Sequence, residues 1–145
     1  MSNHFYLLFR YTKILKGPRK IIVKTLVTKR NTIDTFNFFY DVKNWETGGA
    51  IKSVRMEGQG IWSVETPQGR AKIISRPNKE FGILDHEFVV GDLSWTVFVR
   101  VISNGSGSSV TWTFICPENM QEDQFEEQLK NFDREINSWK KALES

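Results

Sequence analysis

The sequence predicts an α+β fold in which an antiparallel meander of short strands is followed by one long amphipathic helix. Over residues 51–116, runs rich in β-branched and aromatic residues alternate with turn residues, among them the hairpin signal Asn104–Gly105. Over residues 120–143, the apolar residues change to helical spacing. The 145 residues suffice for one domain with its own hydrophobic core.

The expected elements begin with a strand over residues 21–30, which are rich in β-branched side chains. A short helix should follow to about Val42, because Asn31 is a good N-cap and the apolar residues after it have helical spacing. Gly48–Gly49 ends this segment and leaves room for one more helical turn before it. The turn residues then divide the meander into strands over 51–57, 61–66, 70–75, 81–90, 93–102 and 108–116.

The long helix is predicted from a single apolar stripe. Its members, spaced by three or four residues, are Phe125, Leu129, Phe132, Ile136, Trp139 and Leu143. Asn119 is the expected N-cap, with Glu122 three residues further on in a capping box. Such a helix is about 36 Å long, so it must cross several strands to bury its stripe.

The charge is unevenly divided along the chain. Residues 1–30 hold eight Lys and Arg and no acidic residue, whereas the rest holds 12 basic and 17 acidic residues. We expect residues 1–20 to be a basic extension and residues 21–145 to form the domain. The simplest interpretation of the extension is a solvated arm or a start codon placed too far upstream, and contact with a membrane surface is a weaker alternative. Because the main body is acidic, no nucleic-acid partner is expected.

The residue inventory also limits location and chemistry. The single Cys116 cannot form an internal disulfide, and no apolar run approaches the roughly 20 residues that span a bilayer, so we expect an untargeted cytoplasmic protein. One thiol and two distant histidines do not make a metal site. The glycines within residues 58–60 and 105–107 precede strands rather than helices, which argues against a phosphate-binding loop, and no cofactor is expected.

The order of these elements resembles the helix-grip fold of the START-like superfamily, which includes the birch-pollen allergen proteins, lipid-transfer domains and polyketide cyclases/dehydrases. The resemblance covers about residues 21–144. It is carried by the segments TIDTFNFFYDVKNW (32–45), GILDHEF (82–88), VRVISNGSGSSVTWTF (99–114) and FDREINSWKKALE (132–144). The last three are similar to an uncharacterised bacterial branch of the polyketide cyclase/dehydrase-like group. The resemblance implies a sheet curled around the long helix, with a cavity for an apolar ligand between them.

His86 stands between two carboxylates in the sequence Asp85–His86–Glu87. Alternate side chains of a strand face opposite ways, so His86 shares an apolar face with Leu84 and Phe88 while both carboxylates face away. The sequence therefore does not predict a histidine–carboxylate dyad. Two interpretations of His86 stay open: a buried histidine satisfied by a neighbouring group, or a polar group that orients a ligand.

The candidate ligand-binding residues come from several elements. They are Trp45, Trp62, Leu84, His86, Phe88, Trp95, Trp112, Phe114, Phe132 and Ile136. No catalytic residue is assigned, because the sequence offers His86 no partner for acid–base chemistry. Arg100 shares a strand face with Phe98 and Ile102, and we expect it to point outward.

Three functions fit the sequence. The first is binding or transport of a small hydrophobic or lipid-like molecule in a cavity between the sheet and the C-terminal helix. The second is a cyclase/dehydrase-type enzyme acting on a polyketide-like or aromatic substrate, in which His86 shuttles a proton. The third is a protein-interaction module of the chaperone-regulator or ribosome-contacting type, for which the basic extension would matter.

Overall fold

The computed structural model of the chain describes residues 17–145. The predicted basic extension over residues 1–20 therefore lies mostly outside the described part. The elements in chain order are β1 (Ile21–Thr28), α2 (Thr32–Tyr40), the 3₁₀ helix η1 (Val42–Gly48), β2 (Lys52–Gly58), β3 (Ile61–Thr66), β4 (Gly69–Asn78), β5 (Ile83–Val90), β6 (Leu93–Asn104), β7 (Gly107–Ile115) and α3 (Glu122–Glu144).

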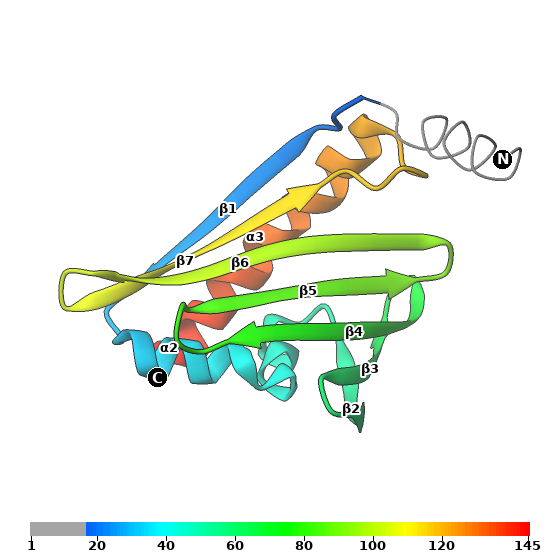
Figure 1. Cartoon of the computed structure of the whole chain (residues 1–145). Helices are drawn as coiled ribbons and strands as arrows, with labels where there is room; N and C mark the ends of the chain where they lie inside the picture. The colour runs from blue at the N-terminus through cyan, green and yellow to red at the C-terminus, as the bar shows by residue number, and fades with distance from the viewer. Residues whose placement is uncertain (1–16) are drawn as a thin grey trace, which may run out of the picture.

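One antiparallel sheet holds the described strands in the order β1-β7-β6-β5-β4-β3-β2. Figure 1 shows the sheet curving in front of α3, which runs diagonally behind it, while α2 and η1 lie below β4 in this view, beside the C-terminal end of α3. The sheet stays open, because β1 and β2 form its two edges and do not pair with each other. The predicted fold class, a curved meander around a long C-terminal helix, is confirmed.

The local signals before and within the meander are also confirmed. The Asn31 side chain accepts a hydrogen bond from the backbone N–H of Asp34 at 2.8 Å, as expected of an N-cap. The extra helical turn before Gly48–Gly49 is η1. In the β6–β7 hairpin, Gly105 has a φ of 58°, a conformation that glycine adopts without strain.

Two boundaries differ from the prediction. The fourth strand of the sheet does not end before Pro77 but continues to Asn78. Pairing of β3 with β4 begins only at Ile74, opposite Ile61, so Pro77 lies where this side of β4 has no β3 partner and needs no N–H donor. Helix α3 begins at Glu122 with Gln121 at the cap position, so Asn119 lies two residues too early to be its cap; its amide donates to the carbonyl of Asp92 at 3.2 Å.

The described end of the basic extension is bound to the domain. The guanidinium of Arg19 donates to the carbonyls of Pro117 and Met120, where β7 leads into α3. The ammonium of Lys20 pairs with Glu126 of α3. These contacts contradict a solvated arm at residues 19 and 20, while the remaining expectations for residues 1–16 lie outside the described residues.

The core consists of two clusters of buried side chains. The larger cluster packs α3 and α2 against β1, β6 and β7. The smaller cluster holds Val42, Ile51, Val64, Ala71 and Ile73, under β3 and β4. Trp45 and Phe88 are the partly buried residues that pack against both clusters. The two clusters therefore meet through a narrow junction rather than a continuous layer.

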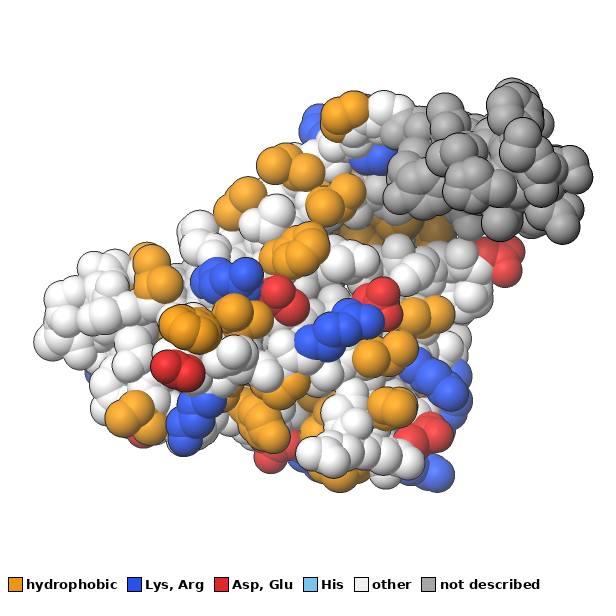
Figure 2. All heavy atoms as spheres, in the orientation of Figure 1, with side chains coloured by type: hydrophobic (Ala, Val, Ile, Leu, Met, Phe, Trp, Pro, Cys, Tyr) orange, Lys and Arg blue, Asp and Glu red, His pale blue; other side chains and the backbone are white. Residues whose placement is uncertain are grey.

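The outer face of the sheet, turned away from α3, is a mixed surface. Figure 2 shows apolar side chains scattered over it among acidic and basic ones. Arg100 points outward here, as predicted, and pairs with Asp85 at 2.6 Å. Among residues 17–145, no helix has the length and apolar character that would let it cross a bilayer.

Candidate functional site: a cavity between the sheet and α3

A cavity of about 550 Å³ lies at the junction of the two core clusters, where their side chains do not form one continuous packed layer. Its walls are the inner faces of β5, β6 and β7, one side of α3, η1 and the turn between β3 and β4. The strand walls follow simple alternation, because every second residue of a strand faces the same way. Thus β5 contributes Leu84, His86, Phe88 and Val90, and β6 contributes Trp95, Val97 and Val99.

Aromatic rings dominate the wall around α3. Trp112 contacts both Phe132 and Trp139, with ring centroids 5.5 and 5.7 Å away, and those two rings also contact each other. The indole N–H of Trp139 donates to the carbonyl of Trp45 at 3.1 Å, and that of Trp45 donates to the carbonyl of Phe39 at 2.9 Å. These two bonds connect α3, η1 and α2, so the rings on this side of the cavity are fixed before any ligand enters.

His86 is 7% exposed, and it has features of both interpretations that the sequence left open: a buried histidine with a satisfied nitrogen, and a polar group that faces the cavity. Its Nδ1 lies 3.0 Å from the carbonyl of Leu84, so Nδ1 carries the proton and Nε2 is an acceptor. Among residues 17–145, Nε2 has no hydrogen-bond partner. The imidazole lines the cavity, with its centroid 4.9 Å from that of Trp45. Burial lowers the pKa of His86, so the ring is neutral at pH 7.

The carboxylates beside His86 make no hydrogen bond to its ring. Asp85 accepts from the backbone N–H of Val99 at 2.8 Å and from Arg100, both on the outer side. Glu87 pairs with Arg76 at 3.1 Å. The prediction that no dyad forms from these sequence neighbours is confirmed.

Eight of the ten predicted ligand-binding residues line this cavity. They are Trp45, Leu84, His86, Phe88, Trp95, Trp112, Phe114 and Phe132. The structure does not bring the other two into it. Trp62 packs against the smaller core cluster, on a strand near the sheet edge, and Ile136 is 8% exposed in the larger cluster.

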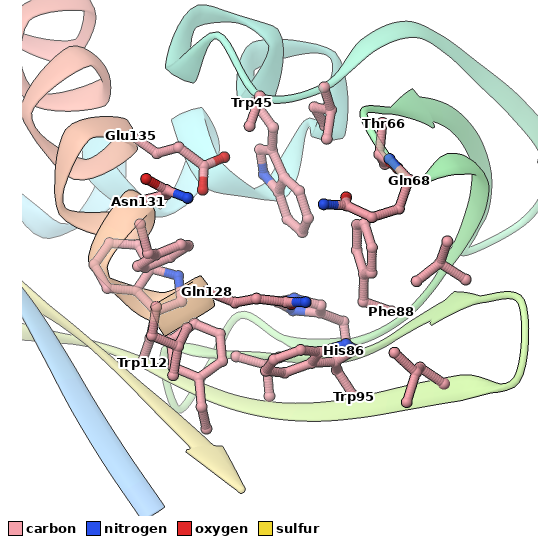
Figure 3. Close-up of a pocket in the computed structure, with 18 of the residues that line it drawn as sticks. Trp45, Thr66, Gln68, His86, Phe88, Trp95, Trp112, Gln128, Asn131 and Glu135 are labelled. Atoms are coloured by element: carbon pink, nitrogen blue, oxygen red, sulfur yellow. The ribbon is translucent and has the colours of Figure 1, made fainter. Parts of the chain in front are cut away.

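The sequence analysis missed the polar row on one flank of the apolar stripe of α3. Gln128, Asn131 and Glu135, spaced by three and four residues, line the cavity from α3. Figure 3 shows the three side chains projecting from the helix into the space, with His86 and Trp45 entering from other walls. The signal was visible as a polar row beside the stripe. Nothing in the sequence, however, says which flank faces the cavity and which faces solvent.

Glu135 is the titratable group of this row. Burial raises the pKa of its carboxyl to about 7, from an ordinary value of 4.5. Between these values the folded chain holds a proton that the unfolded chain releases, so the stability of the fold decreases as the pH rises through this window. Near neutral pH, the cavity therefore contains a carboxyl that is about half protonated.

Replacing Glu135 by glutamine should remove this loss of stability. At pH 8 we expect Glu135→Gln to be more stable than the wild type by on the order of 2 kcal/mol, because the neutral amide avoids the cost of desolvating a charge. At pH 5 the advantage should be much smaller, because the carboxyl is then protonated. Urea denaturation at both pH values measures the difference. An advantage that is the same at both would contradict the raised pKa.

The comparisons with known proteins agree with the fold and go no further. No family model and no curated sequence matches the chain. Its structure is similar to a START superfamily protein from Mycobacterium smegmatis, with a TM-score of 0.72 at 8% identity over 86% of this chain and 97% of that one. It is also similar to the ZhuI aromatase/cyclase from Streptomyces sp. R1128, with a TM-score of 0.68 at 10% identity over 86% and 93%.

A third similar structure is Ara h 8.0201, with a TM-score of 0.64 at 11% identity over 86% of this chain and 97% of that one. The three structures share the arrangement of a curved sheet around a long helix. The chain therefore has the START-like helix-grip fold.

Proposed function

We propose that this chain binds or carries a small hydrophobic molecule, with an aromatic or lipid-like body, in the cavity between the sheet and α3. The observation that carries the proposal is the volume of about 550 Å³ left open beside well-packed core clusters. Ligand sites typically have about 300–1,000 Å³ and are mostly apolar with a few polar groups. The similarity to folds that include an aromatase/cyclase and a START superfamily protein supports this proposal.

The attachment of α3 explains why the cavity does not close by itself. The C-terminal end of the helix is held by Glu144, which accepts from the hydroxyl of Thr28 at 2.8 Å. Its middle is held by the ion pair of Lys24 with Asp133 at 2.9 Å. With the indole bond from Trp139 as a third attachment, the helix is held away from the sheet where the void lies. Such preorganisation lowers the cost of ligand binding.

The proposal is tested by filling the cavity from within. Val97 lies on its wall and is 3% exposed, so Val97→Phe should place a ring in the void with little cost in stability. We expect the variant to bind the neutral fluorescent probe N-phenyl-1-naphthylamine at least about tenfold more weakly than the wild type. Probe fluorescence and quenching of the cavity tryptophans both measure this affinity.

A matched control is Val23→Phe, because Val23 is 51% exposed on the outer face of the sheet. This control should bind the probe with unchanged affinity. If Val97→Phe binds normally and Val23→Phe does not, the probe occupies the outer face and the proposal is wrong.

The facing positions of two titratable groups favour an enzyme as the second candidate. His86 offers an unpaired Nε2 and Glu135 offers a carboxyl with a pKa near 7, and both line the same cavity. An acid and a base on different walls are what proton transfer in a cyclase/dehydrase-type reaction needs. Native mass spectrometry separates the candidates: a compound that co-purifies and stays unchanged on incubation is a ligand, whereas its conversion indicates an enzyme.

We assign this function to a domain over residues 21–145 in the cytoplasm. The buried Cys116, the only cysteine of the chain, supports a reducing compartment. An interaction role for the basic extension depends on residues 1–16, which lie outside the described residues.

A further inference from the structure

The cavity is lined mainly by apolar side chains, but the few ionisable groups among them are mostly acidic. Two carboxyl groups, Asp92 and Glu135, line the cavity, and among residues 17–145 no lysine or arginine does. The one basic side chain there, His86, is neutral at pH 7 because burial lowers its pKa. A ligand anion would therefore lose its hydration without gaining a counter-charge from these walls.

The surroundings of Glu135 suit a cation. Figure 3 shows its carboxylate directed into the cavity on the side of Trp45. The stem of Glu135 packs against η1, since a Cβ placed on Gly48 would lie 3.3 Å from the Glu135 Cβ. Trp139, one helical turn further along α3, lines the same part of the cavity. A carboxylate with tryptophan rings near it attracts an organic ammonium group by charge, and the rings add cation–π contact where the group reaches their faces.

We infer that the ligand is an organic amine, with a protonated amino group held by Glu135 and the neighbouring tryptophan rings, and a flat apolar body against the aromatic wall. This inference rests on the proposed binding function and deepens it by naming the ligand class. The wall opposite offers Nε2 of His86 and the amide of Gln68 for any further polar group on the body.

Because Glu135 titrates, the preference of the cavity for an amine over a neutral or anionic ligand depends on pH. An ammonium ion binds the ionised carboxyl, so at pH 6 the ligand must first displace a proton from a group with a pKa of about 7. Other charged groups near the site do not supply this behaviour: burial lowers the pKa of His86, which disfavours its protonation, and on η1 Lys43 and Glu46 pair with each other at 3.0 Å. Asp92, in the β5–β6 turn, is the other carboxyl that lines the cavity.

The test uses three probes with one body and different charge: 2-naphthylmethylamine, 2-naphthylmethanol and 2-naphthoate. Isothermal titration calorimetry on the full chain at pH 8 should give the amine the tightest binding and the carboxylate the weakest. The amine should bind about tenfold more tightly at pH 8 than at pH 6, whereas the alcohol should bind equally at both. Titration at pH 6 in buffers of different ionisation enthalpy should detect proton release on amine binding.

Glu135→Gln should bring the ratio of amine to alcohol affinity close to one and remove its pH dependence. Glu127→Gln is the matched control, because it removes an exposed carboxylate that pairs with Lys130 on the same helix outside the cavity, and it should keep the ratio. No amine binding at pH 8, or an alcohol that binds as tightly as the amine, overturns the inference. If N-phenyl-1-naphthylamine still binds, the proposed function survives that result; if it also fails to bind, the proposed function fails as well.

Discussion

Replacing Phe125 by alanine is expected to lower the free energy of unfolding by about 3–5 kcal/mol. Phe125 is 0% exposed and stacks on Trp95, with ring centroids 5.7 Å apart. Because its neighbours are fixed by the sheet and by α3, they cannot collapse into the space that the ring leaves. Urea denaturation of the variant and the wild type measures the loss.

Phe132→Ala is the matched comparison on the same helix. Phe132 borders the cavity and is only partly buried, so its removal enlarges an existing void and should cost about 1–3 kcal/mol. It should also weaken binding of an aromatic probe, because Phe132 belongs to the cavity wall, whereas Phe125 does not. Equal losses of stability for both variants would show that the cavity is closed in solution.

Gly82→Ala is expected to destabilise the fold by about 2–5 kcal/mol, the sum of backbone strain and a steric clash. Gly82 has a φ of 66°, and a Cβ there would overlap the carbonyl oxygen of Val101. The neighbouring strand cannot move away easily, because the backbone N–H of Val101 donates to the carbonyl of Gly82 at 2.8 Å. Thermal and urea denaturation measure the effect.

Gly105→Ala separates strain from clash. Gly105 has a similar φ of 58°, but nothing lies within 4 Å of the position of its Cβ. This variant should therefore lose only the cost of the left-handed conformation, about 1–2 kcal/mol. If Gly82→Ala is no worse than Gly105→Ala, the close approach of the β4–β5 turn to β6 is not a constraint on the fold.

Most of the fold could be predicted from the sequence because its signals are local. The Asn31 cap, the Asn104–Gly105 hairpin and the change of apolar spacing near residue 120 each depend on a few neighbouring residues. The wrong predictions depended on distant partners instead. Asn119 is a residue type that caps helices, but α3 begins at Glu122 and the Asn119 amide contacts Asp92 on the β5–β6 turn. Pro77 is tolerated in β4 because β3 begins only at Ile61, opposite Ile74, and leaves Pro77 without a β3 partner.

In the candidate site, too, the features that follow from local sequence could be predicted and those that depend on distant partners could not. Alternation along β5 placed His86 on the inner face, since a period of two holds whatever lies opposite. Glu135 could not be predicted from the sequence as a cavity-lining residue. The apolar stripe of α3 has a polar row on either side, and only the packing of the helix decides which row borders the cavity. The prediction that Trp62 lines the cavity was wrong for a similar reason: its ring packs against the smaller core cluster, formed by β3, β4 and η1.

The separation of the two core clusters has a consequence for how this protein can change over evolutionary time. Side chains that face a void are not constrained by close packing, so wall positions can exchange size or polarity while the clusters on either side keep the fold intact. Substitutions there would be nearly neutral for folding and yet would alter which molecule is retained. Such a division lets a lineage acquire new ligands without passing through unfolded intermediates.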